Sequence, residues 1–239
     1  MIGNLEPEYV SSPLAPALDA RTQQWVPKAL QGSQQKRAIG HRVAKRGADV
    51  VLSLLGLLVL MPALVLVAAL VRVTSKGPAL FWQQRVGLNN KIFWCCKFRT
   101  HYAHCCDASG VRQTLLGDPR VTPLGRFLRR HSIDELPQLW NVLRGDMSLV
   151  GPRAHVADML VCGVRFDQVV ERYQDRHHVQ PGITGLAQVR GFRGPVLDLD
   201  HARGRVECDL EYIEQSSLRL DLAIIARTLI LEMSHGSGT

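Results

Sequence analysis

Residues 50–71 read VVLSLLGLLVLMPALVLVAALV and carry no charged side chain. With a rise of about 1.5 Å per residue, an α-helix of this length would cross the roughly 30 Å hydrocarbon core of a membrane. Such length and uniformity are rare in the buried helices of soluble domains. The segment therefore predicts a membrane element in place of a core helix.

Two features of this apolar segment oppose a straight membrane-spanning helix. Pro62 lies in its middle, where a proline removes a backbone hydrogen bond and bends a helix. The flanking basic residues are Arg42, Lys45 and Arg46 before the segment, and Arg72 and Lys76 after it. The positive-inside rule places such residues on the cytoplasmic side. We therefore expect residues 39–76 to form a re-entrant helix–break–helix with both flanks in the cytoplasm, and with protein packed around the bend because exposed backbone polar groups are costly in lipid.

The rest of the chain divides where its composition changes. Residues 1–38 carry scattered proline, serine and glutamine without periodicity, which predicts a disordered tail. They also lack the charged and apolar regions of a secretory signal, so reduced cysteines in a cytosolic setting are expected. Residues 77–232 are expected to form a cytosolic domain, followed by a flexible tail at 233–239. The predicted fold class is α+β and mainly helical, with a small α/β domain and amphipathic helices at the membrane interface.

Local patterns predict the elements of this domain. Residues 77–100 combine aromatic and β-branched residues with a G-L-N-N turn, which favours strands. Leucine and aromatic residues recur at spacings of three and four over residues 121–145, which predicts a helix ended by Gly145. The other predicted elements are a polar loop at 101–118, a helix at 155–176, a turn at 181–185, a short extended piece at 186–191, and one or two amphipathic helices at 205–232 interrupted near Ser216 and Ser217.

The chain is basic, with 29 Lys and Arg against 21 Asp and Glu and a formal charge of +8. A basic surface indicates anionic partners such as phosphorylated small molecules or anionic lipid, and the alternative is a solvated face without a partner. No recognition motif supports nucleic acid as the partner.

The stretch CCKFRTHYAHCC (95–106) is rich in cysteine and histidine, but its spacing matches no common zinc pattern. Adjacent cysteines of a strand also point to opposite faces, so we expect no metal there.

The segment RRHSIDELPQLWNVLRGDMSLVGPR (129–153) holds two adjacent carboxylates, Asp134 and Glu135. One interpretation is a capping box, in which Ser132 and Glu135 satisfy backbone N–H groups at the start of a helix. That start would make Pro137 a helix-interior residue without a donor, so a helix that starts nearer Asp134 is favoured. The other interpretation is that the two carboxylates are catalytic. Neighbouring helical side chains project about 100° apart, so one carboxylate can be a nucleophile while the other holds a divalent cation among phosphate-binding arginines. Both interpretations stay open on the local pattern alone.

Many separate motifs occur in a specific order along residues 40–232. They are KRGAD (45–49), the proline-broken apolar segment, GPALFWQQRVG (77–87), KFRT (97–100), DPRVTPLGRFLRRHSIDELPQLWNVLRGDMSLVGPR (118–153), PGITGLAQVRG (181–191) and RVECDLEYI (205–213). In this order they closely resemble the bacterial sugar transferases, and among them the small monotopic polyprenyl-phosphate glycosyl-1-phosphate transferases. The resemblance implies the re-entrant membrane element and makes residues 77–232 a catalytic domain.

The resemblance also implies an activity and a location. Such enzymes transfer a sugar-1-phosphate from a UDP-sugar to undecaprenyl phosphate and release UMP. They do so through a covalent phosphosugar–aspartate intermediate, at the cytoplasmic face of the bacterial inner membrane among its lipids, as the first membrane step of exopolysaccharide or other glycan synthesis. The positions that match the family's functional residues are Asp134 as nucleophile, Glu135 as Mg²⁺ ligand, Lys97 as a further catalytic residue, and Arg129 (for the lipid phosphate), Arg153 and Asp209 as substrate-binding residues.

Four places depart from the family's pattern, and one of them is Ser216-Ser217, where the family often has Trp-Ser. Met61 precedes Pro62 where Ser is frequent, which would allow a straighter membrane segment. Ala154 stands where the family has a second proline, and His101 follows KFRT in place of Met. None of these changes touches the acidic pair. The motifs do not specify the sugar or the oligomeric state, a homo-oligomer included, and a non-enzymatic membrane adaptor is the alternative to an enzyme.

Overall fold

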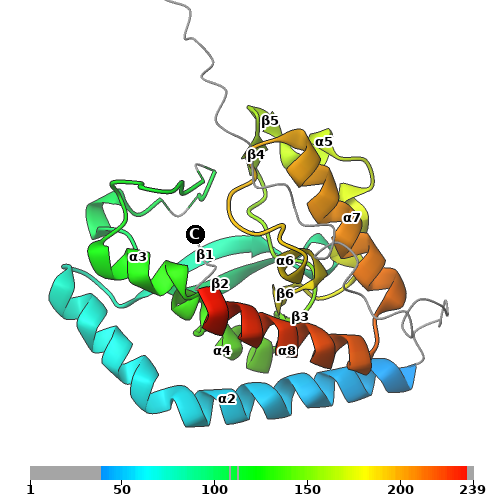
Figure 1. Ribbon diagram of the computed structural model, residues 1–239, viewed down its shortest axis with the longest axis horizontal. Coiled ribbons are helices and arrows are strands. Elements are labelled where there is room, and N and C mark those ends of the chain that lie inside the picture. The colour runs from blue at the N-terminus through cyan, green and yellow to red at the C-terminus, as the bar shows by residue number, and fades with distance from the viewer. Residues whose placement is uncertain (1–38, 108, 112, 236–239) are drawn as a thin grey trace, which may run out of the picture.

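The computed structural model describes residues 39–107, 109–111 and 113–235 (Figure 1). The tail expected at 1–38 lies outside these residues, and so do the last four residues of the tail expected at 233–239. The described part is mainly helical and contains three two-stranded sheets. The predicted α+β, mainly helical class is therefore confirmed.

The apolar segment lies in α2 (Ile39–Thr74), the longest described helix. Figure 1 shows that α2 changes direction part-way along and that the rest of the domain lies on one side of it. The helix continues through Pro62, so the expected helix–break–helix takes the form of a bent but uninterrupted helix. Of the described helices, α2 alone has the length and apolar composition to cross a membrane, and much of it is exposed, Val59 to 76%.

The domain holds α2 near both ends. At the amino-terminal end, Lys45 Nζ lies 2.7 Å from Asp221 Oδ2 in α8 and donates to a carbonyl of the domain core. At the carboxyl-terminal end, the Arg99 guanidinium donates to the Ser75 carbonyl at 2.8 Å and to neighbouring carbonyls, which satisfies the free acceptors of the helix end. Both basic flanks of the apolar segment are therefore fastened to the same domain.

The predicted β-structure after α2 is confirmed. β1 (Leu80–Val86) and β2 (Ile92–Phe98) form an antiparallel hairpin joined by a short 3₁₀ turn at Leu88–Asn90. Phe81 pairs with Lys97 and Arg85 pairs with Phe93, so strand alternation puts Arg85 and Lys97 on the same face of the hairpin.

The single helix predicted over 121–145 is wrong. The segment contains α3 (Pro123–Arg130), the 3₁₀ turn η4 (Ile133–Glu135) and α4 (Gln138–Arg144). Ser132 has a left-handed backbone with φ of 50°, which turns the chain after α3. Pro137, which has no N–H, directly precedes α4. The predicted stop at Gly145 is confirmed by its φ of 91°, a conformation that glycine adopts without strain.

The helix predicted at 155–176 is also wrong. The segment contains β4 (Leu160–Val161), β5 (Val164–Arg165), the one-turn helix α5 (Phe166–Val169) and the start of the 3₁₀ helix η5 (Tyr173–His178). Cys162 and Gly163 form a two-residue hairpin turn with φ of 51° and 80°. Two consecutive positive φ values are the signature of a tight hairpin turn and interrupt any helix.

The PGITGLAQVRG motif differs from prediction in both halves. Its turn is the strand β6 (Gly182–Thr184), which pairs in parallel with β3 (Ser148–Val150), and its extended piece is the short helix α6 (Leu186–Val189). A Cβ atom on Gly182 would lie 2.1 Å from the Gly151 nitrogen, so only glycine permits this backbone approach. A contact between distant segments therefore decides this region.

The carboxyl-terminal helices agree with prediction. α7 (Leu199–Gln215) and α8 (Leu218–His235) are separated at Ser216 and Ser217, as the interrupted pattern indicated, and α8 extends past the boundary expected at 232. Both helices pack on α6 around one buried apolar cluster. Figure 1 shows most of α7 on the side of the domain away from α2.

Candidate active site

A cavity of about 230 Å³ lies among the β1–β2 hairpin, the turn η4 and the segment that leads into α7. Five of the six predicted site residues line it, namely Lys97, Arg129, Asp134, Glu135 and Arg153. The sixth, Asp209, is buried outside the lining. The structure thus brings together residues that lie more than fifty positions apart in the sequence.

The turn that carries the two carboxylates is built from local signals. Thr122 caps α3 by accepting the Gly125 N–H at 2.9 Å, and α3 runs until Ser132 reverses the chain. The Ser132 hydroxyl donates to Glu232 at 3.2 Å and caps no helix, so the capping-box interpretation is wrong. The helix that was expected to start nearer Asp134 is preceded by a 3₁₀ turn that contains both acids, and α4 itself starts later, at Gln138.

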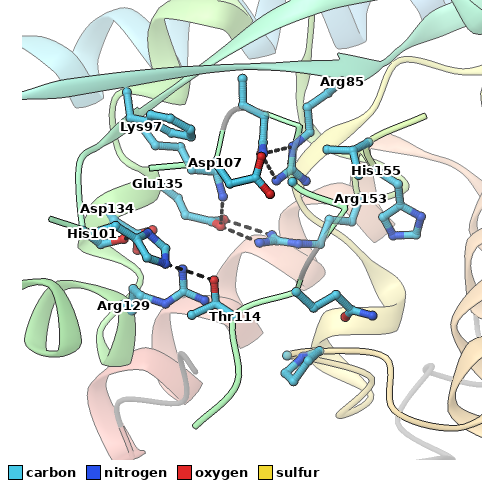
Figure 2. A pocket seen from close by; sticks show the side chains of 18 of the residues that line it. Arg85, Lys97, His101, Asp107, Thr114, Arg129, Asp134, Glu135, Arg153 and His155 are labelled. Atoms are coloured by element: carbon cyan, nitrogen blue, oxygen red, sulfur yellow. Dashed lines mark hydrogen bonds and ion pairs between the residues drawn. The ribbon is translucent and has the colours of Figure 1, made fainter. Parts of the chain in front are cut away.

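Glu135 is held between two cations. Lys97 Nζ lies 2.7 Å from Oε1, and the Arg153 guanidinium binds both carboxylate oxygens, one of them at 2.9 Å (Figure 2). Burial acts to raise the pKa of Glu135, but the charges of Arg153 and Lys97 outweigh it and hold the pKa well below its usual range. Glu135 is therefore a fixed carboxylate that orients both cations.

Asp134 has the opposite electrostatic setting. It is 4% exposed, and burial together with the negative charge of Glu135 raises its pKa, with Lys97 and Arg129 opposing. Figure 2 shows Asp134 beside His101 and Arg129, on the other side of Glu135 from Arg153. The two adjacent carboxylates thus differ in their electrostatics. Glu135 is paired and ionised, whereas Asp134 is desolvated and has a raised pKa.

Asp209 supports the site from behind the cavity wall. Its Oδ2 lies 2.6 Å from Arg176, and both side chains are almost fully buried. Arg176 also donates to the Arg153 carbonyl at 2.7 Å. Asp209 therefore positions the backbone of Arg153 through Arg176. No motif in the sequence singled out Arg176, which lies at the end of the segment that was expected to be a helix.

The cavity has two ends of different composition. The acidic end contains Asp134 and Glu135 with their cations, whereas Arg85 and His155 line the opposite end, here named the arginine end (Figure 2). Arg205 also lines the cavity, and its charge acts on His155, so it belongs to the arginine end. Sequence reasoning missed the arginine end. Strand alternation with Lys97 was a usable signal for Arg85, but nothing in the sequence indicated that the other two would line a cavity.

The cysteine-rich stretch contributes only in part to the cavity. Cys95 and Cys96 are buried in β2, and Cys105 and Cys106 reach the lining. All six cysteines are free thiols. Within the described ranges, no cluster of three or more His, Cys, Asp or Glu residues is arranged to hold a metal ion.

Comparison with known proteins identifies the family. Residues 40–235 match the model of a family described as bacterial sugar transferase. The chain belongs to this family. The resemblance expected from the order of its motifs is therefore confirmed.

Proteins similar to this chain come from several bacteria. It is 47% identical over 196 residues to an exopolysaccharide production protein of Rhizobium leguminosarum bv. phaseoli, covering 82% of this chain and 98% of that protein. It is 50% identical over 189 residues to an undecaprenyl-phosphate glucose phosphotransferase of Komagataeibacter xylinus, covering 79% of this chain but 36% of that protein. It is 48% identical over 187 residues to a UDP-glucose:undecaprenyl-phosphate glucose-1-phosphate transferase of Caulobacter vibrioides, covering 77% and 68%.

Proposed function

We propose that this sugar transferase moves glucose-1-phosphate from UDP-glucose to undecaprenyl phosphate and releases UMP, in the synthesis of an exopolysaccharide. The observation that carries the proposal is a buried carboxylate, Asp134, beside the paired carboxylate Glu135 in a cavity lined by cations. The names of the relatives from Komagataeibacter and Caulobacter supply the sugar and the lipid, and the Rhizobium name supplies the pathway.

In the proposed reaction, Asp134 is the nucleophile. Its ionised oxygen forms a bond to the phosphorus next to the sugar, and the bond between that phosphorus and the bridging oxygen of UMP breaks. An oxygen of undecaprenyl phosphate then attacks the same phosphorus and frees the Asp134 carboxylate. Two displacements avoid the need for both substrates to react in one step.

The cations around the acids would bind the phosphoryl oxygens. Lys97 and Arg153 are oriented by Glu135, so their positions are set before a substrate arrives, and Arg129 lines the same end of the cavity. Preorganised cations that face developing negative charge are the main source of rate enhancement in phosphoryl transfer. We assign Arg129 to the lipid phosphate.

The residues present fit Mg²⁺ as a cofactor that arrives with its substrate. Mg²⁺ is commonly held by one or two carboxylates together with substrate phosphates. Glu135 would hold it, but its oxygens face Lys97 and Arg153, so the oxygens of a bound diphosphate must supply other ligands. When bound, Mg²⁺ would neutralise the charge of the diphosphate.

We infer that α2 enters the membrane and returns to the same, cytoplasmic face. The exposed apolar surface of α2 suits lipid, whereas both of its ends contact one domain. A helix that crossed the bilayer would place those ends on opposite sides, out of reach of a single domain. Single cysteines at positions 42 and 76, in a background without the native cysteines, are expected to stay unlabelled by an impermeant reagent outside intact cells. Labelling of either position from outside contradicts the inference.

The activity is tested with purified protein, Mg²⁺, undecaprenyl phosphate and a panel of UDP-sugars. The expected result is UMP release with formation of a lipid-linked sugar phosphate, fastest with UDP-glucose. A different preferred sugar would overturn only the sugar assignment. Membrane binding without UMP release from any donor would overturn the proposed function and support an adaptor.

A further inference from the structure

The arginine end of the cavity holds positive charge that its neighbours do not neutralise. Arg205 is 3% exposed, and one of its terminal nitrogens donates to the Gly194 carbonyl at 2.9 Å. Its Nε finds no acceptor within the described part of the chain. Arg85, which is partly buried, donates only to neutral oxygens among the residues that the structure describes, those of the Gln83 amide and the Ala154 carbonyl.

Neither guanidinium is paired with a carboxylate of the described residues. Asp209 lies one helical turn after Arg205 on α7, but its carboxylate is bonded to Arg176. Burial, reinforced by repulsion from Arg153 and opposed by the more distant charge of Asp209, lowers the pKa of Arg205 to about 9, and the group remains a cation at neutral pH. A buried charge without a directly bonded counter-ion is unfavourable. A cavity that keeps one is suited to an anionic ligand.

His155 adds a neutral donor at the same end. It is 2% exposed, and burial and the surrounding arginines hold its pKa well below the usual range, so the ring is uncharged. Arg176 has only N–H groups to offer, so the contact between Arg176 and His155 Nδ1 makes Nδ1 the acceptor. The ring proton therefore resides on Nε2. This buried N–H also finds no partner among the residues that the structure describes.

We propose that Arg205, together with His155 and Arg85, binds the phosphate of the departing nucleotide. The inference rests on the proposed function and assigns residues to the leaving UMP group. Figure 2 places His155 and Arg85 across the Glu135 carboxylate from Asp134. In a displacement at phosphorus the attacking and leaving oxygens lie roughly in line, so the leaving group is on the side opposite the nucleophile. A guanidinium fork matches phosphate oxygens, and the imidazole N–H supplies a further donor.

The position of Arg205 favours the soluble nucleotide over the lipid as the source of this phosphate. Arg205 lies on α7, and Figure 1 shows most of α7 on the side of the domain away from α2. A lipid phosphate would reach the cavity from the side of α2. A phosphate monoester from either source has the same chemistry, so the experiment must compare both.

The test measures the affinities of UMP, uridine and farnesyl phosphate by calorimetry with the full chain in detergent. Arg205→Met is expected to weaken UMP binding at least about 30-fold, because it removes a buried charge partner, and to leave uridine and farnesyl phosphate unchanged. Arg205→Lys, which keeps the charge without the fork, is expected to show an intermediate loss. Arg203→Met is the matched control, since Arg203 lies on the same helix with its side chain 57% exposed, and it is expected to bind UMP as the unmodified protein does.

A structural role for Arg205 predicts different outcomes. Loss of UMP and uridine binding together, or a large fall in melting temperature, would overturn the assignment, because removal of an unpaired buried charge is expected to leave the melting temperature equal or higher. Selective loss of farnesyl phosphate would assign the site to the lipid and overturn it as well. If Arg205→Met does not fold, Arg205→Lys with unchanged UMP affinity overturns the proposal and a selective UMP loss supports it. A protein that binds UMP through Arg205 but turns over no UDP-sugar would overturn the proposed function alone.

Discussion

The two ends of the cavity balance their charges in different ways. At the acidic end, Glu135 has two cationic partners within hydrogen-bond distance, and Asp134 lies beside it with a raised pKa. At the arginine end, Arg205 and Arg85 have only neutral acceptors among the described residues. A network in which carboxylates and cations pair with each other holds its side chains in place. A network with unpaired cations favours an anionic ligand. Under the two proposals, the chemistry takes place at the acidic end and the nucleotide phosphate binds at the arginine end.

The largest expected effect is at the acidic end. Asp134→Asn keeps the shape of the side chain but removes the nucleophile, so UMP release is expected to fall about 10⁴-fold or more. The matched control is Asp107→Asn, because Asp107 also lines the cavity but is exposed and accepts hydrogen bonds from the neighbouring residues Ser109 and Gly110. Turnover by Asp134→Asn within tenfold of the control would contradict the assignment of the nucleophile.

The buried arginines Arg176 and Arg205 differ in whether a carboxylate is bonded to them. Arg176 is paired with Asp209, so Arg176→Met leaves a buried carboxylate alone and is expected to lower the free energy of unfolding by about 3–5 kcal/mol. Arg205→Met leaves no buried carboxylate without its partner, so it is expected to lower the free energy of unfolding far less. Chemical denaturation of both variants in the same detergent measures the difference. Equal losses would show that Arg205 is a structural residue and would remove the distinction between paired and unpaired cations.

The smallest expected effect is a shift of the pH profile. Asp134 must be ionised to attack, and its pKa is raised, so the rate of UMP release rises with pH through that pKa and then levels off. Glu135→Gln removes a neighbouring negative charge and is expected to move the rise to lower pH. Lys97→Met removes a positive charge and is expected to move it to higher pH. The measurement uses UDP-glucose without lipid acceptor, because the lipid phosphate itself titrates. Shifts of the same sign in both variants would contradict the electrostatic coupling.

The sequence predicted those features that local residues determine. The β-hairpin, the stop at Gly145 and the break at Ser216 follow from turn and cap chemistry. Five residues that the family resemblance named as site residues line the cavity, and their roles stay predictions. The basic residues on both sides of the apolar segment of α2 were also visible in the sequence. It did not show that Lys45 and Arg99 fasten the two ends of that helix to one domain, because those partners lie far apart in the chain.

The failures have physical causes that local patterns do not carry. Residues 155–176 contain a tight turn at Cys162 and Gly163, and the apolar spacing around it resembles that of a helix. The strand at Gly182 depends on a close approach to Gly151, which only the folded chain creates. The arginine end was missed because pairing of charges is a property of the folded structure. The motif RVECDLEYI contains Arg205 and Asp209, but only the structure shows that Asp209 is bonded to Arg176 and not to Arg205.

The most direct test of the central claim uses the enzyme without its lipid acceptor. Labelled UDP-glucose and Mg²⁺ are mixed with the protein, and both released UMP and protein-bound label are counted. A nucleophilic Asp134 predicts a burst of about one UMP per active site, with label attached to the peptide that contains Asp134 and none in Asp134→Asn. UMP release that requires undecaprenyl phosphate from the first turnover, without label on the protein, would contradict the claim.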